Sequence, residues 1–165
     1  MRALIGLGSN LAHPRRRIAL AQRALARLSR TRVLALSPNY RTAPLGTSGP
    51  QPEYVNAVAI VDSELAPRAL LARLLAIERA NGRVRSPGVR NAARRLDLDL
   101  LLFGRRRQRG VALVLPHPRM HERAFVLRPL IDVAPHAVIP GRGLARSLLR
   151  RVAGQPIVRT HRRHL

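Results

Sequence analysis

The sequence contains no cysteine and no lysine. Without cysteine, the chain can form neither disulfide bonds nor thiolate zinc sites, and it has no cysteine nucleophile. Without lysine, it cannot form the lysine-containing loop that holds phosphates in P-loop proteins. Tryptophan is also absent, and tyrosine and phenylalanine number two each. These absences leave carboxylates, histidines and arginines as the main reactive groups.

Long apolar runs are missing as well. Hydrophobic residues make up 46% of the chain, but no run approaches the roughly 20 residues that a membrane span needs. Residues 1–8 lack the apolar segment and cleavage site of a secretory signal. A length of 165 residues is typical of one domain. We therefore expect a cytoplasmic monomer with one domain over 1–158 and an unstructured basic tail over 159–165.

Acidic residues are scarce: eight stand against 31 arginines, for a net charge of +23. Guanidinium groups suit phosphates because they donate paired hydrogen bonds and keep their charge. The bias toward arginine, alanine, proline and glycine is also typical of a GC-rich genome. An anionic partner is favoured in either case. Any carboxylate chemistry must come from a short set: Glu53, Asp62, Glu64, Glu78, Asp97, Asp99, Glu122 and Asp132.

Hydrophobic periodicity predicts strands over 3–8, 32–42, 54–62 and 96–103, with a short edge strand over 111–115. It predicts one helix from Pro14 with Asn10 as its cap, and a second from Pro67 to Asn81-Gly82. Two more follow over 122–133, interrupted or ended near Pro129, and over 144–152. The order strand, helix, strand, strand, helix, strand is typical of an α+β ferredoxin-like sandwich. We expect a mainly antiparallel sheet with helices on one face.

The strongest local signal is the segment 94–101, Arg-Arg-Leu-Asp-Leu-Asp-Leu-Leu. On a strand, Asp97 and Asp99 share one face because side chains alternate. Their Cα atoms then lie roughly 6.5–7 Å apart. Two like charges at this range favour a cation between them, and magnesium prefers such oxygen ligands. The alternative is a solvated face with salt bridges to nearby arginines.

Five arginines precede this carboxylate pair, in a loop over 83–95 that also contains Pro87 and Gly88. We expect this loop to be exposed and mobile. Magnesium with convergent guanidinium groups is suited to phosphoryl transfer, where catalysis consists mainly of positioning and charge neutralisation. A solvated basic loop is the alternative for any one of these arginines.

Two weaker patterns accompany these signals. Tyr54 and Asn56 share a strand face, and an aromatic ring beside an amide suits a flat heterocycle, although these two residues alone favour core packing. His117 and His121 have the spacing of metal ligands on a helix, but Pro116 and Pro118 oppose a continuous helix there. His117 is more plausible as a hydrogen-bond partner for a phosphate.

Six segments together resemble the 6-hydroxymethyl-7,8-dihydropterin pyrophosphokinase family, over about residues 3–150. They are Gly8-Ser9-Asn10, the run 40–46 (Tyr-Arg-Thr-Ala-Pro-Leu-Gly), Tyr54-Val55-Asn56-Ala57, the run 77–85 with Glu78, the arginine–aspartate segment, and the run 116–125 from Pro116 to Phe125. The resemblance implies transfer of pyrophosphate from ATP to the pterin hydroxymethyl group in folate biosynthesis, with release of AMP.

The resemblance also implies residue roles. Asp97 and Asp99 would hold two magnesium ions, and Arg83 and Arg94 would reach the phosphates when their loop closes as a lid. The implied ATP-binding set is Glu78, Arg83, Arg85, Arg94, His117 and Arg123. The implied pterin-binding set is Thr42, Ala43, Pro44, Leu45, Tyr54, Asn56 and Phe125.

The chain departs from the family pattern at Leu75, Asn91 and Arg95, where the family usually has glutamine, tryptophan and threonine. These changes bear on adenine contacts and lid closure. Two rival functions remain. One is an RNA-binding domain with the same element order, although the chain lacks its aromatic signature. The other is a catalytically inactive relative.

Overall fold

The computed structural model describes residues 1–44, 50–82, 93 and 95–160. Within them, six strands form one sheet in the order β5-β1-β4-β3-β8, and β2 also pairs with β4. All recorded strand pairs are antiparallel, as predicted. The strands are β1 (Arg2–Ser9), β2 (Thr31–Leu36), β3 (Tyr40–Thr42), β4 (Tyr54–Ser63), β5 (Asp97–Phe103) and β8 (Val158–Arg159). β6 (Val138–Ile139) and β7 (Gly143–Leu144) form a separate ribbon.

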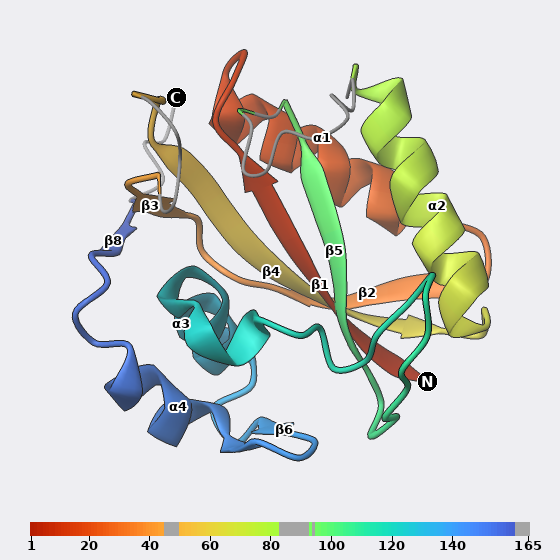
Figure 1. Cartoon of the computed structure of the whole chain (residues 1–165). Helices are drawn as coiled ribbons and strands as arrows, with labels where there is room; N and C mark the ends of the chain where they lie inside the picture. The colour runs from red at the N-terminus through yellow and green to blue at the C-terminus, as the bar shows by residue number, and fades with distance from the viewer. Residues whose placement is uncertain (45–49, 83–92, 94, 161–165) are drawn as a thin grey trace.

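Helices cover both faces of the sheet, so the prediction of helices on one face was wrong. In Figure 1, α1 (Pro14–Ala26) and α2 (Pro67–Ala80) lie together at the upper right. The 3₁₀ turn η1 (Met120–Glu122), α3 (Ala124–Val133) and α4 (Ala145–Arg151) form the second layer. None of the helices in the described part of the chain has the length and apolarity of a membrane span.

Strand alternation divides the buried residues into two clusters. Ile5 and Leu7 of β1 pack with Leu98 and Leu100 of β5 against α1 and α2. The second cluster joins Leu4, Val58 and Leu101 to α3 and α4. The pairing register of β1 with β5 shifts beside Leu101. Because both faces of the sheet are apolar near its centre, each needs its own helical layer.

Several predicted elements have different bounds. The strand expected over 32–42 is two strands, β2 and β3, and Pro38, which has no N–H for the ladder, lies between them. The segment 111–115 forms only an isolated bridge between Gln108 and Leu115 rather than an edge strand. α3 continues through Pro129 instead of ending there. The remaining predicted strands and helices agree to within a few residues.

The start of α1 also differs from the prediction. Pro14 occupies the first turn as expected, but the helix begins after His13, and no side chain caps it. The side chain of Asn10 instead donates to Gln51 Oε1 at 3.2 Å and to the carbonyl of Pro52 at 3.3 Å. Asn10 thus connects the turn after β1 to the segment before β4.

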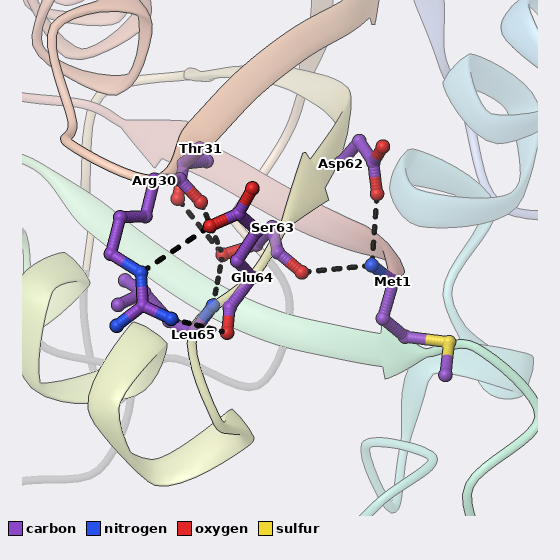
Figure 2. A network of polar contacts seen from close by, with 7 residues as sticks. All are labelled: Met1, Arg30, Thr31, Asp62, Ser63, Glu64 and Leu65. Atoms are coloured by element: carbon purple, nitrogen blue, oxygen red, sulfur yellow. Dashed lines mark hydrogen bonds and ion pairs between the residues drawn. The ribbon is translucent and has the colours of Figure 1, made fainter.

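A polar network closes the end of the β1–β4 pair opposite to Asn56 (Figure 2). The Met1 ammonium donates to Asp62 Oδ1 at 2.9 Å and to the carbonyl of Ser63 at 2.8 Å. The hydrogen bond from the Met1 ammonium to Asp62 holds the pKa of that carboxyl below its ordinary value. Nearby, Arg30 pairs with Glu64, and the hydroxyls of Thr31 and Ser63 lie 2.8 Å apart. The network fixes the ends of β1, β2 and β4 relative to one another.

The C-terminal segment is more ordered than the sequence predicts. Arg159 lies in β8 opposite Tyr40 of β3, and the Thr160 N–H donates to the Asn39 carbonyl at 2.8 Å. The expectation of an unstructured tail from Arg159 was therefore wrong for these two residues. The rest of that tail, 161–165, lies outside the described residues.

Candidate active site

A pocket of about 430 Å³ lies between the sheet and the layer that contains η1 and α3. Its size falls within the usual range for small-molecule sites. It is lined by Gly6, Leu7, Gly8, Thr42, Ala43, Tyr54, Asn56, Ala57, Asp97, Asp99, Leu101, His117, Arg119, Glu122, Arg123, Phe125 and Val126. Residues from four strands, the 116–119 segment, η1 and α3 thus converge on one cavity.

Two glycines of β1 form the floor of this pocket. Gly8 pairs with Asn56 of β4 on one side and with Asp97 of β5 on the other, while Gly6 pairs with Asp99. A Cβ atom at Gly8 would lie 3.4 Å from Asn56 Oδ1 and 4.0 Å from Asp97 Cβ. The absence of a side chain at Gly8 therefore keeps open the space between the amide and the carboxylate.

The predicted carboxylate pair lies on the pocket face of β5. Asp97 and Asp99 are partly exposed, whereas their neighbours Leu96, Leu98 and Leu100 are buried on the opposite face. Behind the strand, the backbone N–H of Leu98 donates to Glu78 Oε1 of α2 at 2.7 Å. Glu78 is 1% exposed and does not line the pocket. In the described structure, it supports the strand between the two aspartates.

An amide and two aromatic rings form another part of the pocket wall. Asn56 is buried, and its Nδ2 donates to Thr42 Oγ1 at 2.8 Å. Tyr54, two residues earlier on β4, donates its hydroxyl to Gln51 Oε1 at 3.3 Å. Phe125 enters from α3, with the Arg123 guanidinium 5.4 Å from its ring centre. These side chains provide flat apolar surfaces beside polar groups held in place by hydrogen bonds.

His117 is held as a neutral hydrogen-bond donor. The Arg119 N–H donates to its Nδ1 at 3.3 Å, which places the proton of the neutral ring on Nε2. Burial, together with the charges of Arg123 and Arg119, lowers the pKa of His117 to about 4 against the opposing effect of Asp97. The ring is therefore uncharged at neutral pH.

The pocket brings together nine of the residues singled out from the sequence: Thr42, Ala43, Tyr54, Asn56, Asp97, Asp99, His117, Arg123 and Phe125. Pro44 is described but does not line it. Four predicted site residues lie outside the described residues: Leu45, Arg83, Arg85 and Arg94. Most of the predicted lid over 83–95 lies outside them as well. So does Asn91, one of the departures from the family pattern.

Sequence reasoning missed other pocket residues. Arg119 and Glu122 lie between His117 and Arg123 and line the same wall. Arg119 belongs to the segment 116–125 that carried the resemblance, so its position was a usable signal. Gly6 and Gly8 alternate with the buried Ile5 and Leu7, and that alternation could have indicated an open strand face.

No group of three or more metal-ligating side chains occurs among the residues that the structure describes. His121 lies 3.2 Å from Glu122 Oε1 rather than joining His117 in a metal site. The Asp97–Asp99 pair has the oxygen donors that magnesium prefers, but a carboxylate pair alone leaves most coordination positions to water or substrate. The donor set thus fits a magnesium ion shared with a phosphate-bearing substrate.

The fold and the pocket define a class of protein: an α+β domain with a carboxylate pair beside a small-molecule pocket. The family model for 7,8-dihydro-6-hydroxymethylpterin-pyrophosphokinase matches residues 4–135. The chain belongs to this family and is therefore an ATP-dependent diphosphotransferase of folate biosynthesis.

Curated relatives and solved structures agree with this assignment. A 2-amino-4-hydroxy-6-hydroxymethyldihydropteridine pyrophosphokinase of Pseudomonas aeruginosa is 49% identical over 148 residues, 89% of this chain and 90% of the relative. The Haemophilus influenzae enzyme of the same name is 40% identical over 157 residues, 95% and 96% of the two chains. A Plasmodium falciparum HPPK-DHPS structure has a TM-score of 0.71 at 12% identity and covers 93% of this chain and 44% of that one. The structural likeness shows a shared fold. The family model and the relatives support the pyrophosphokinase function, so the RNA-binding alternative is not favoured.

Proposed function

We propose that this pocket transfers the pyrophosphoryl group of Mg-ATP to the hydroxymethyl group of 6-hydroxymethyl-7,8-dihydropterin and releases AMP. The observation that carries the proposal is the arrangement around Gly8. Asn56 and Asp97 lie on either side of a residue with no side chain. No side chain at Gly8 therefore separates a heterocycle bound at Asn56 from the carboxylate of Asp97.

The pterin lies in the part of the pocket formed by Tyr54, Asn56 and Phe125. A flat ring packs favourably against aromatic faces, and a buried amide reads its hydrogen-bonding edge. The hydrogen bond from Asn56 to Thr42 fixes the orientation of that amide. Thr42, Ala43, Pro44 and Leu45 supply the remaining pterin contacts that the family resemblance implies.

Asp97 and Asp99 hold magnesium, and we propose two ions. Magnesium bound there would neutralise phosphate charge and favour attack at phosphorus. The two carboxylates lie on one face of a strand whose backbone is fixed from behind by Glu78. Their positions are therefore set before substrate binds, and they undergo little reorganisation during the reaction.

The ATP phosphates lie toward His117 and Arg123. Neutral His117 offers an Nε2–H donor, and the Arg123 guanidinium offers charge that persists at any physiological pH. Arg83, Arg85 and Arg94 complete the proposed contacts to ATP. Glu78, the remaining member of the ATP-binding set that the resemblance implies, acts from behind β5 through its hydrogen bond to the Leu98 N–H. Closure of the loop over 83–95 would bring its arginines to the phosphates and exclude water.

In the reaction, the hydroxymethyl oxygen bonds to the β-phosphorus of ATP, and the hydroxyl proton is released to solvent. The bond from that phosphorus to the oxygen bridging it to the α-phosphate breaks, and AMP leaves with the bonding electrons. Arg123 and the arginines of the 83–95 loop stabilise charge on the transferred group and on AMP, as in other phosphoryl transfers.

We also propose the finer architecture. With β2 and β3 counted as one interrupted strand, the sheet order is fourth, first, third, second, which supports a ferredoxin-like sandwich. One domain over 1–158, a monomeric state and a cytoplasmic location remain proposals.

The test is AMP release from Mg-ATP with and without 6-hydroxymethyl-7,8-dihydropterin, for the wild type and Asp97→Ala. We expect pterin-dependent AMP from the wild type and its loss in the variant. Glu64→Ala, which removes a carboxylate that is 76% exposed and pairs with Arg30, serves as control. No AMP from folded wild type would contradict the proposal, and AMP release independent of pterin would reassign the acceptor to water.

A further inference from the structure

Gln155 lies after α4, twenty residues beyond the segment that the family model matches. Its side-chain amide makes two hydrogen bonds to the backbone next to the pocket. The Ala124 N–H donates to Gln155 Oε1 at 2.9 Å, and Gln155 Nε2 donates to the Glu122 carbonyl at 2.8 Å. The backbone N–H of Gln155 itself donates to the carbonyl of Val152 at 3.0 Å. The amide thus bridges a fixed C-terminal turn to the start of α3.

The two hydrogen bonds of Gln155 flank a single residue, Arg123. Arg123 is extended, with φ −121° and ψ 109°, and it precedes the first turn of α3. The side chain of Arg123 makes no capping hydrogen bond to that helix. The Ala124 N–H is one of the helix-initial donors that lack an intrahelical partner, and Ala124 is 2% exposed. Gln155 therefore supplies the missing acceptor from a distant part of the chain.

The backbone at 122–124 carries side chains that line the pocket. Glu122 and Arg123 line it from one side of the fixed peptide groups, and Phe125 lines it from the first turn of α3. The Arg123 guanidinium lies over the Phe125 ring at 5.4 Å. A shift of the backbone at 122–124 would move both side chains together.

The same C-terminal segment then reaches β3, which contributes Thr42 to the pocket. Val158 and Arg159 pair with Arg41 and Tyr40 of β3, the strand that carries Thr42. The Thr160 N–H donates to the Asn39 carbonyl beside it. Residues 155–160 thus connect the α3 wall to the β3 wall, and the position of Gln155 is fixed from both ends.

We infer that Gln155 is a positioning residue that fixes the direction of Arg123 and Phe125 toward the nucleotide and the pterin. The inference rests on the proposed function, because those two residues contact substrate only if that proposal holds. Small displacements of substrate-contacting groups reduce rates strongly, by about 10²-fold for 1 Å. Gln155 should therefore affect catalysis more than its distance from the reacting atoms suggests.

The experiment is a double-mutant cycle that combines Gln155→Leu with Arg123→Ala, with kcat and KM measured for ATP and for the pterin. Leucine keeps most of the side-chain volume and removes both hydrogen bonds. We expect Gln155→Leu to lower kcat/KM for ATP about 10-fold in the wild-type background. In the Arg123→Ala background, the same change should cost under about 2-fold for ATP, because the group it positions is gone. Gln22→Leu on α1, at the opposite face of the sheet, is the matched control.

A purely structural role predicts equal losses of kcat/KM in both backgrounds, and that result would overturn the inference. A wild-type value for Gln155→Leu would overturn it too. If Gln155→Leu does not fold, Gln155→Glu replaces it in the cycle, because a carboxylate keeps the acceptor and removes the donor. An inactive wild type would overturn the proposed function and this inference with it, whereas active wild type with unaffected variants would overturn only the role of Gln155.

Discussion

The two faces of the sheet differ in the side chains that β5 presents to them. Toward α1 and α2 lie Leu98 and Leu100 of β5 and Leu96 just before it, each at most 3% exposed. Toward α3, the alternate positions Asp97 and Asp99 are partly exposed and line a cavity. The face toward α1 and α2 is filled by side chains, while the face toward α3 combines a second apolar cluster with the pocket that we propose carries the chemistry. Stability and activity should therefore respond separately to mutations only one residue apart.

The largest effect is expected at Asp99. Asp99→Ala should lower turnover at least about 10³-fold, because a metal clamp supplies several kcal/mol at the transition state. Its melting temperature should stay close to that of the wild type, since the side chain is partly exposed. Steady-state AMP release and thermal melting measure the two quantities. A variant that retains turnover would remove Asp99 from the metal site.

The neighbouring Leu98 should behave in the opposite way. Leu98→Ala is expected to lower the free energy of unfolding by about 2–5 kcal/mol, as other buried leucine truncations do. At a temperature where the variant is folded, its kcat should stay within about 3-fold of the wild-type value. Urea unfolding followed by activity assays tests both numbers. A large loss of kcat in the folded variant would mean that the two faces are coupled through β5.

A smaller effect is expected where α3 attaches to the sheet. The Tyr40 hydroxyl, on β3, donates to Asp132 of α3, and Arg128 lies 3.6 Å from the same carboxylate. Burial, with the hydrogen bond to Asp132, raises the pKa of Tyr40. Tyr40→Phe should cost about 1–3 kcal/mol, because it removes the hydroxyl partner of a largely buried carboxylate.

Chemical unfolding measures the loss at Tyr40, and Tyr54→Phe, which removes a hydroxyl from the pocket side of β4, is the comparison. Equal stability of Tyr40→Phe and the wild type would show that Arg128 alone suffices for Asp132.

The smallest effect is a dependence of stability on pH at His117. The folded pKa is about 4 and the ordinary value is 6.5. Between these values the unfolded chain binds the proton more strongly, so the contribution of His117 is complete above pH 6.5 and is lost as pH falls toward 4. His117→Gln should remove about 1–2 kcal/mol of this dependence, a figure reduced for partial exposure of the ring. Unfolding of both proteins at pH 4.5 and pH 7.5 checks the difference; identical pH dependence would contradict it.

Much of this molecule was predictable from local patterns. The alternation of leucine and aspartate over 96–100 predicts both the strand and the separation of its two faces. Pro67 and Asn81-Gly82 predict the bounds of α2, and Gly82 has the positive φ of 76° that a helix-terminating glycine adopts. The family resemblance implies a site role for eleven of the described residues; nine of them line one pocket, and Pro44 and Glu78 do not.

Other features depend on residues far apart in the chain. Asn10 was expected to cap α1, but its partners Gln51 and Pro52 are some forty residues away, so no local rule could find them. The break at Pro38 follows its lack of a backbone donor, yet β2 and β3 still pair with the same strand, β4. Helices on both faces also escaped prediction, because periodicity identifies the apolar stripe of a helix but not the layer that receives it.

The sequence by itself determined which side chains can bind magnesium, phosphate and a flat heterocycle, because those properties belong to residue types and to spacing along a strand. Only the tertiary structure decided that Gly8 leaves open the space between Asn56 and Asp97, and that Gln155 holds the backbone on both sides of Arg123. Both depend on contacts between segments more than thirty residues apart, whose geometry is set by packing of the whole sheet rather than by any local pattern.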